Sequence, residues 1–268
     1  MEFLIVNGKK LEYTWFGPGP DQAPTLVFLH EGLGCAALWH DFPARLAERT
    51  GCGALVFSRS GYGGSEGCEL PRPVRFMHDE GLTVMPALFE AVGIRRAFLI
   101  GHSDGGSIAL IFAGGLRPKP VLGLITLAAH VYCETLTRQS IEKIGREFNH
   151  GPLRAALQKY HGSNTDGAFW GWHDVWLHPD FVHWNIEDYL PRIAVPILAV
   201  QGENDVYGTP GQVRSIEEKA GAGAEVLLMQ GCGHAPHKDM PEVVLAAMAT
   251  FILKAASPSK RRGVSVDS

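Results

Sequence analysis

Residues 97–105 read Ala97-Phe98-Leu99-Ile100-Gly101-His102-Ser103-Asp104-Gly105, and an apolar segment over residues 106–113 follows them. The first four residues are typical of a buried strand, and residues 106–113 are typical of a buried helix. A serine on so sharp a strand-to-helix turn is held in a strained backbone conformation with its hydroxyl exposed. Gly101 and Gly105 lack a Cβ that would collide with the neighbouring strand or helix. The free N–H groups at the start of the helix would stabilise negative charge that develops next to the serine.

This motif by itself also fits a second interpretation. Ser103 would then only cap the helix of a glycine-rich turn in a doubly wound sheet. The remainder of the chain has to decide between the two.

Length and composition indicate one large α/β domain. The chain has 268 residues, of which 46% are hydrophobic and 19% charged, so a large core can be buried. The net charge of −4 gives no indication of the basic surface that nucleic-acid binding requires. Five cysteines without a C-x-x-C pair favour a reducing compartment over a disulfide framework or a structural zinc site. With no signal-peptide pattern and no run of ~20 apolar residues, we expect a cytoplasmic protein without metal, nucleic-acid or membrane contact.

Apolar segments alternate with helical segments along most of the chain, which is typical of a mostly parallel sheet with helices on both faces. An Asn7-Gly8 turn predicts a hairpin at the start. The expected strands cover residues 3–6, 11–15, 25–29, 54–57, 97–100, 121–128, 196–200 and 224–229. The expected helices cover residues 37–49, 76–91, 106–113, 209–220 and 241–255. Ligands of such a sheet bind at the carboxyl ends of its strands.

Residues 131–190 interrupt this alternation, because no buried strand is expected there. Residues 135–148 and 152–160 have helical spacing, and residues 169–176 and 181–184 are rich in aromatic side chains. We expect a helical cap over the ligand-binding edge, with residues 1–130 and 191–256 as the core and 257–268 as a flexible tail. Most tryptophans should form the cap's own small core, whereas Trp172 and Trp176 are expected to line the pocket.

A serine hydroxyl becomes a good nucleophile only when a base takes its proton and a carboxylate orients that base. Asp205 and His234 follow two successive expected strands, so the order along the chain is Ser, Asp, His. Three alternatives stay open. Glu134 follows an earlier strand and would replace Asp205, His130 ends a strand at the same edge, and His237 is expected at the surface or next to the site.

These segments together resemble the α/β-hydrolase family over about residues 11–255. The turn at Ser103 is similar to the nucleophile elbow of that family. Four further segments resemble its acid loop, its histidine loop, its arginine–glycine–serine loop and its oxyanion loop: Gly202-Glu203-Asn204-Asp205, Gly233-His234, Ser58-Arg59-Ser60-Gly61-Tyr62-Gly63-Gly64-Ser65 and His30-Glu31-Gly32-Leu33-Gly34.

The resemblance implies a serine hydrolase that cleaves an ester, a lactone or a related acyl bond of a small molecule, without a cofactor. It implies that the oxyanion is held by the backbone N–H groups of Asp104 and Gly32. Glu31 and Leu33 are expected to contact substrate, together with the two tryptophans above. A monomer or homodimer is expected. A serine at the elbow argues against dehalogenase or epoxide hydrolase chemistry, while a carbon–carbon bond hydrolase of aromatic degradation and a non-enzymatic small-ligand receptor remain alternatives.

Two residues depart from the family pattern. Glu31 stands where a glycine is usual, and we expect it to form a structural hydrogen bond. Asp104 stands where many relatives have an apolar residue. It either caps the helix, where negative charge is favoured, or attracts a cationic group of the substrate.

Overall fold

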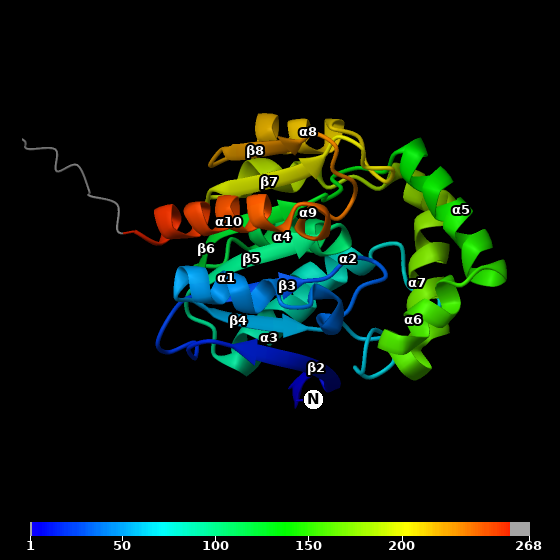
Figure 1. The fold of residues 1–268 in the computed structure, drawn as a ribbon, viewed down its shortest axis with the longest axis horizontal. Coiled ribbons are helices and arrows are strands. Elements are labelled where there is room, and N and C mark those ends of the chain that lie inside the picture. The colour runs from blue at the N-terminus through cyan, green and yellow to red at the C-terminus, as the bar shows by residue number, and fades with distance from the viewer. Residues whose placement is uncertain (1, 258–268) are drawn as a thin grey trace, which may run out of the picture.

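A computed structural model describes residues 2–257 of the chain. Its centre is an eight-stranded sheet with the order β1-β2-β4-β3-β5-β6-β7-β8, shown in Figure 1. The strands are β1 (Glu2–Val6), β2 (Lys9–Phe16), β3 (Thr25–Leu29), β4 (Gly53–Phe57), β5 (Ala97–His102), β6 (Val121–Leu127), β7 (Ile197–Gly202) and β8 (Ala224–Met229). β1 and β2 are antiparallel to their neighbours, whereas the pairs from β4 to β8 are parallel. The predicted fold class is confirmed.

Local sequence explains both parts of this sheet. Asn7 and Gly8 have φ angles of 50° and 77°, as a two-residue hairpin turn between β1 and β2 requires. Every residue of β3, β4, β5 and β7 is buried. Strands covered on both faces read as continuous apolar runs, which is why these could be located from composition alone.

Helices cover both faces of the sheet. On one face lie α1 (Phe42–Thr50) and α10 (Pro241–Ala256), and their apolar side chains share a core with Leu26, Phe28 and Ile100. A second apolar core lies on the opposite face of the sheet. The helices that contribute to it are α2 (Phe76–Asp79), α3 (Met85–Val92), α4 (Asp104–Leu116) and α8 (Gly211–Lys219). α2 and α3 are joined by a π-helical turn over Glu80–Val84, so the predicted helix 76–91 is continuous but not regular. The short α9 (Pro236–Asp239) precedes α10.

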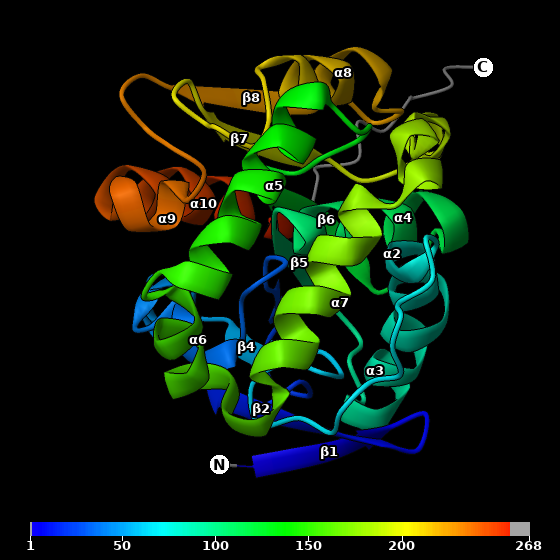
Figure 2. The same cartoon turned by 90° about the vertical axis from the view of Figure 1, so that its right-hand side faces the viewer.

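Three further helices lie together beyond one end of the sheet: α5 (Thr135–His150), α6 (Leu153–His161) and α7 (Thr165–Leu177). Figures 1 and 2 show them as a separate group, and we call them the insertion helices. The Nδ1 atom of His161 accepts a hydrogen bond of 3.0 Å from the backbone N–H of Gly63. The side chain of Asn164 donates to the backbone oxygens of Gly63 and Ser65. These bonds fasten the insertion helices to the loop that follows β4.

The prediction of one helix over residues 37–49 was wrong. A 3-10 turn over Ala36–Trp39 ends at His40, whose φ is 50°, and α1 begins only at Phe42. Pro43 is the cause, since proline has no N–H to donate and its ring collides with the carbonyl four residues earlier. A proline is tolerated in the first turn of a helix, and it therefore marks where α1 starts.

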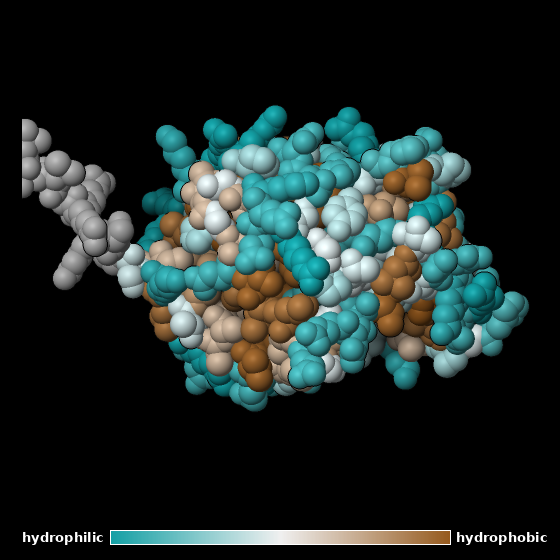
Figure 3. Space-filling model, turned by 90° about the horizontal axis from the view of Figure 1, so that it is seen from above, coloured by the Kyte–Doolittle hydropathy of each residue, from teal (hydrophilic) through white to brown (hydrophobic). Residues whose placement is uncertain are grey.

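Among residues 2–257, no helix is both long enough and apolar enough to cross a membrane. The face shown in Figure 3 is largely hydrophilic, with hydrophobic residues gathered in a few patches. The predicted tail beyond Ser257 lies outside the described residues.

Candidate active site

Ser103 occupies the strained turn that the sequence predicts. Its φ and ψ are 51° and −118°, a region that non-glycine residues rarely adopt and that is typical of functional sites. A Cβ on Gly105 would lie 2.1 Å from the backbone oxygen of Leu29, and one on Gly101 would lie 2.3 Å from the oxygen of Gly105. The close approach of β3, β5 and α4 thus requires both glycines and holds the serine at the apex.

His234 and Asp205 are hydrogen-bonded to each other. The Nδ1 atom of His234 lies 2.9 and 2.8 Å from the two carboxylate oxygens of Asp205. Asp205 is itself held by the backbone N–H of Tyr207 at 2.8 Å and by the side-chain amide of Gln201 at 2.6 Å. Because Nδ1 of His234 is bound to the carboxylate, its Nε2 atom is available to a different partner.

The surroundings of Asp205 favour its ionised form. Burial alone raises the pKa of Asp205, but the hydrogen bonds and charge interaction with His234 outweigh it, and the pKa lies below its ordinary value. The Asp205 side chain is only 1% exposed. It is therefore an ionised, fixed carboxylate that can stabilise a positive charge on the imidazole.

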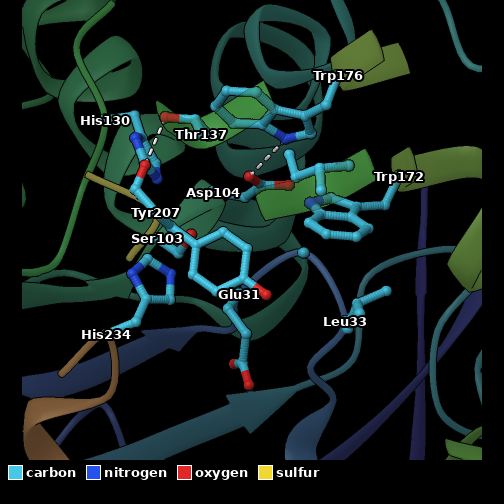
Figure 4. A pocket seen from close by; sticks show the side chains of 12 residues that line it. Glu31, Leu33, Ser103, Asp104, His130, Thr137, Trp172, Trp176, Tyr207 and His234 are labelled. Atoms are coloured by element: carbon cyan, nitrogen blue, oxygen red, sulfur yellow. Dashed lines mark hydrogen bonds between the residues drawn. The ribbon is translucent and has the colours of Figure 1, made fainter. Parts of the chain in front are cut away.

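Ser103 and His234 line the same cavity, which has a volume of about 110 Å³. Figure 4 shows it with the side chains of the residues that surround it. Within residues 2–257 no hydrogen bond joins the Ser103 hydroxyl to the imidazole. Hydrogen bonds of this kind are often long without a bound ligand and tighten in the substrate complex. The lining residues are Glu31, Gly32, Leu33, Ser103, Asp104, His130, Thr137, Ile141, Trp172, Trp176, Tyr207 and His234.

The loop after β3 presents Gly32 to this cavity. A Cβ at Gly32 would lie 2.1 Å from Nε1 of Trp172 on α7, so the insertion packs directly on the loop. His30 fixes the loop backbone, because its Nε2 accepts the backbone N–H of Arg59 at 3.0 Å while Nδ1 lies 2.7 Å from the oxygen of Glu31. The backbone N–H of Gly32 has no hydrogen-bond partner in the part of the chain that the structure describes. The N–H of Asp104 is in the first turn of α4, where backbone donors lack a partner inside the helix.

The carboxylate of Glu31 lies close to one histidine ring and one lysine. One carboxylate oxygen lies 3.3 Å from Nδ1 of His102, and the other lies 3.7 Å from Nζ of Lys238. Nε2 of His102 in turn lies 2.8 Å from the backbone oxygen of His234. Burial raises the pKa of Glu31, but the interactions with His102 and Lys238 bring it well below its ordinary value. Glu31 therefore links the loop after β3 to the loop that carries His234.

Replacing Glu31 by glutamine is expected to lower the free energy of unfolding by about 1–2 kcal/mol at pH 7, because Lys238 and the buried His102 ring lose the carboxylate that faces them. The native carboxyl has a depressed pKa, so its contribution is present above about pH 4.5 and declines as the pH falls below that value. Urea unfolding at pH 7 and pH 4 measures both effects. Glu48→Gln, at an exposed position of α1, is the matched control. A Glu31→Gln deficit that grows toward pH 4 would contradict the depressed pKa of the Glu31 carboxyl.

Asp104 does not cap α4. Its Oδ1 accepts a hydrogen bond of 3.2 Å from Nε1 of Trp176, and its side chain is fully buried at the cavity wall. Trp176 and Trp172 both project from α7 into the same space, as Figure 4 shows.

The structure also places the three alternative residues. Glu134 accepts hydrogen bonds from Thr209 and Gln212 and none from His234, so it is not the partner of the histidine. His237 is buried and packs on Trp39 and His102, with ring centroids 4.7 and 4.9 Å away. It is therefore not at the surface but lies next to the site, which is the second of its two expected placements. His130 lines the cavity.

Three lining residues were missed by sequence reasoning. Thr137 and Ile141 lie four residues apart on α5, so the spacing that puts them on one helix face was visible. Tyr207 follows Asp205 by two residues, and its ring centroid is 4.8 Å from that of His234. No signal in the sequence shows how α5 docks, which is what brings the first two to the site.

Residues 26–247 match the alpha/beta hydrolase family, and the chain belongs to that family of enzymes. It is 21% identical to a proline iminopeptidase of Lactobacillus helveticus in an alignment 270 residues long. That alignment covers 86% of this chain and 90% of that protein. Two solved structures share the fold. The enol-lactonase of Burkholderia xenovorans LB400 aligns with a TM-score of 0.73 and 16% identity over 94% of this chain and 99% of that one. A thermophilic esterase of Thermogutta terrifontis aligns with a TM-score of 0.72 and 17% identity over 96% and 99%.

Proposed function

We infer that Ser103, His234 and Asp205 form a catalytic triad that hydrolyses an ester, a lactone or a related acyl bond of a small molecule. One observation carries this proposal. A serine on a strained turn shares a small cavity with a histidine whose other nitrogen is held by a buried carboxylate. Each group alone has a structural explanation, but the three together are the arrangement that activates a hydroxyl for nucleophilic attack.

The reaction then proceeds through an acyl-enzyme. Nε2 of His234 takes the proton of the Ser103 hydroxyl as its oxygen attacks the substrate carbonyl. The backbone N–H groups of Asp104 and Gly32 hold the oxyanion, and losing one such donor typically costs a factor of ~10² to 10³ in rate. The imidazolium returns its proton to the leaving group. Water, deprotonated by His234, then releases the acyl group and restores the serine.

The insertion helices complete the site as a cap. Trp172 rests on the loop of Gly32, and Trp176 holds Asp104, so α7 forms the wall opposite the serine. Leu33 and Ile141 add apolar surface, which favours a small substrate with an apolar portion. The names of two structurally similar proteins, an enol-lactonase and an esterase, support an acyl bond as the bond that is cleaved.

The test is a panel of short p-nitrophenyl esters, lactones and thioesters, assayed with a fluorophosphonate probe that labels activated serines. Sustained turnover of at least one member is expected, together with loss of that turnover when the probe labels Ser103, located by mass spectrometry of the labelled peptide. Labelling at another residue, or turnover that survives full labelling, would refute the assignment.

The two alternatives give different results in the same assay. A receptor would release one equivalent of p-nitrophenol in a burst without further turnover. A carbon–carbon bond hydrolase would turn over the esters slowly and cleave a vinylogous 1,5-diketone at a higher kcat/KM. Rapid hydrolysis of the esters alone supports the proposed activity.

A further inference from the structure

The cavity contains a buried carboxylate that the proposed reaction does not use. The Asp104 side chain is fully buried, and its Oδ1 is occupied by the indole N–H of Trp176. Its Oδ2 has no hydrogen-bond partner among residues 2–257. Figure 4 shows the carboxylate in the cavity between Trp176 and Trp172. A buried polar atom without a partner is costly, so a ligand that donates a hydrogen bond there would gain free energy.

A second possible acceptor lines the same cavity. His130 is 2% exposed, and its ring forms no hydrogen bond within the described residues. Its ring centroid is 5.1 Å from that of Trp176 and 5.9 Å from that of His234. Burial, with the neighbouring His234, lowers the pKa of His130 to about 3. At ordinary pH the ring is therefore neutral, so it offers one lone pair without repelling a cation.

The charged groups near Asp104 affect its ionisation, and therefore the charge of the ligand that it would bind. Burial raises the pKa of Asp104, and the charges of Arg59 and Arg72 oppose that rise. Neither arginine lines the cavity or hydrogen-bonds to Asp104 in the described part of the chain. A cation that enters the cavity would be the direct partner of the free oxygen, and it would favour the ionised carboxylate.

We propose that Asp104, assisted by His130, binds a primary ammonium group of the substrate beside the scissile carbonyl. The substrates would then be esters or related acyl compounds that carry a free amine near the carbonyl, such as aminoacyl esters. This inference rests on the proposed function, because it places the amine relative to the carbon attacked by Ser103. An ammonium has several N–H donors, which suits a cavity that two acceptors line.

The experiment compares two substrates that differ only by the amine: phenylalanine ethyl ester and 3-phenylpropanoic acid ethyl ester. The native protein is expected to hydrolyse the amino ester with a kcat/KM at least tenfold higher. Asp104→Asn keeps the size of the side chain and an acceptor for Trp176 but removes the charge, so the ratio of the two kcat/KM values should fall at least tenfold. Asp21→Asn, at an exposed position where the carboxylate lies 3.9 Å from Nε of Arg95, controls for net charge and should leave the ratio unchanged.

Binding without turnover separates this inference from the proposed function. In Ser103→Ala, calorimetry should show phenethylamine bound at least tenfold more tightly than 2-phenylethanol, and this comparison needs no Asp104 variant to fold. Ser103-dependent hydrolysis of both esters with an unchanged ratio in Asp104→Asn would overturn the amine site and leave the proposed function intact. Equal binding of the amine and the alcohol would also overturn the amine site. Preferential amine binding by a protein that turns over no member of the ester, lactone and thioester panel would support the amine site while the triad proposal fails.

Discussion

Replacing Ser103 by alanine is expected to lower kcat/KM for the best ester of the panel by a factor on the order of 10⁴ or more. Without the hydroxyl no acyl-enzyme forms, and only the binding groups and the oxyanion donors remain. The substitution should hardly affect folding, because alanine has the same Cβ at the strained φ of 51° and the hydroxyl makes no hydrogen bond to His234. We expect the free energy of unfolding to change by less than about 1 kcal/mol.

Steady-state kinetics and urea unfolding of the purified variant measure both quantities. Ser60→Ala is the matched control, since Ser60 lies on the loop after β4 and donates only to the backbone oxygens of Glu66 and Gly67. It should retain at least half of the native kcat/KM. If the Ser103→Ala variant kept more than a tenth of native activity, Ser103 could not be the nucleophile.

Replacing Asp205 by asparagine is expected to lower kcat by a factor of about 10⁴. The backbone N–H groups of Tyr207 and Gly208 donate to Oδ1, so the amide oxygen of the asparagine would take that position. Its NH₂ group would then face Nδ1 of His234. When Nδ1 accepts from this NH₂ group, the ring proton moves to Nε2, and that atom can no longer accept the proton of Ser103.

The same substitution should also destabilise the fold. The new NH₂ group would meet the side-chain amide of Gln201, which now donates to Oδ2 at 2.6 Å, and two donors would face each other. We expect a loss of about 1–3 kcal/mol, the cost of leaving a buried donor without an acceptor.

Glu134→Gln tests the alternative acid in the same assay. Its carboxylate is bound by Thr209 and Gln212, so we expect less than a tenfold change in kcat. If Glu134→Gln lost as much activity as Asp205→Asn, or if Asp205→Asn retained a tenth of native kcat, the assignment of the acid would be wrong.

Much of the fold could be predicted because its signals are local. The buried strands β3 and β5 are short apolar runs, and the turn at Ser103 needs its glycines wherever that turn occurs. Helix boundaries were less predictable. The segment after β3 has a helical pattern of apolar residues, and Pro43 interrupts it. The prediction of one helix followed the apolar pattern and gave the proline too little weight.

The surroundings of the proposed triad were less accessible to sequence reasoning. Glu31 was identified as a departure, but its partner His102 lies 71 positions further along the chain and is brought near it by the pairing of β3 with β5. The alternatives at Asp104 were evenly matched in the sequence. Only the docking of α7, which places Trp176 on Oδ1, decides that the carboxylate faces the cavity.

The sequence by itself determined the family, the order of the strands along the chain and the three residues proposed to react, because each depends on residue types at short spacing. Only the tertiary structure decided which further side chains line the cavity. Thr137 and Ile141 reach it because the insertion helices pack on distant loops. Such packing depends on the summed contacts of many residues far apart in the chain, and no short segment encodes it.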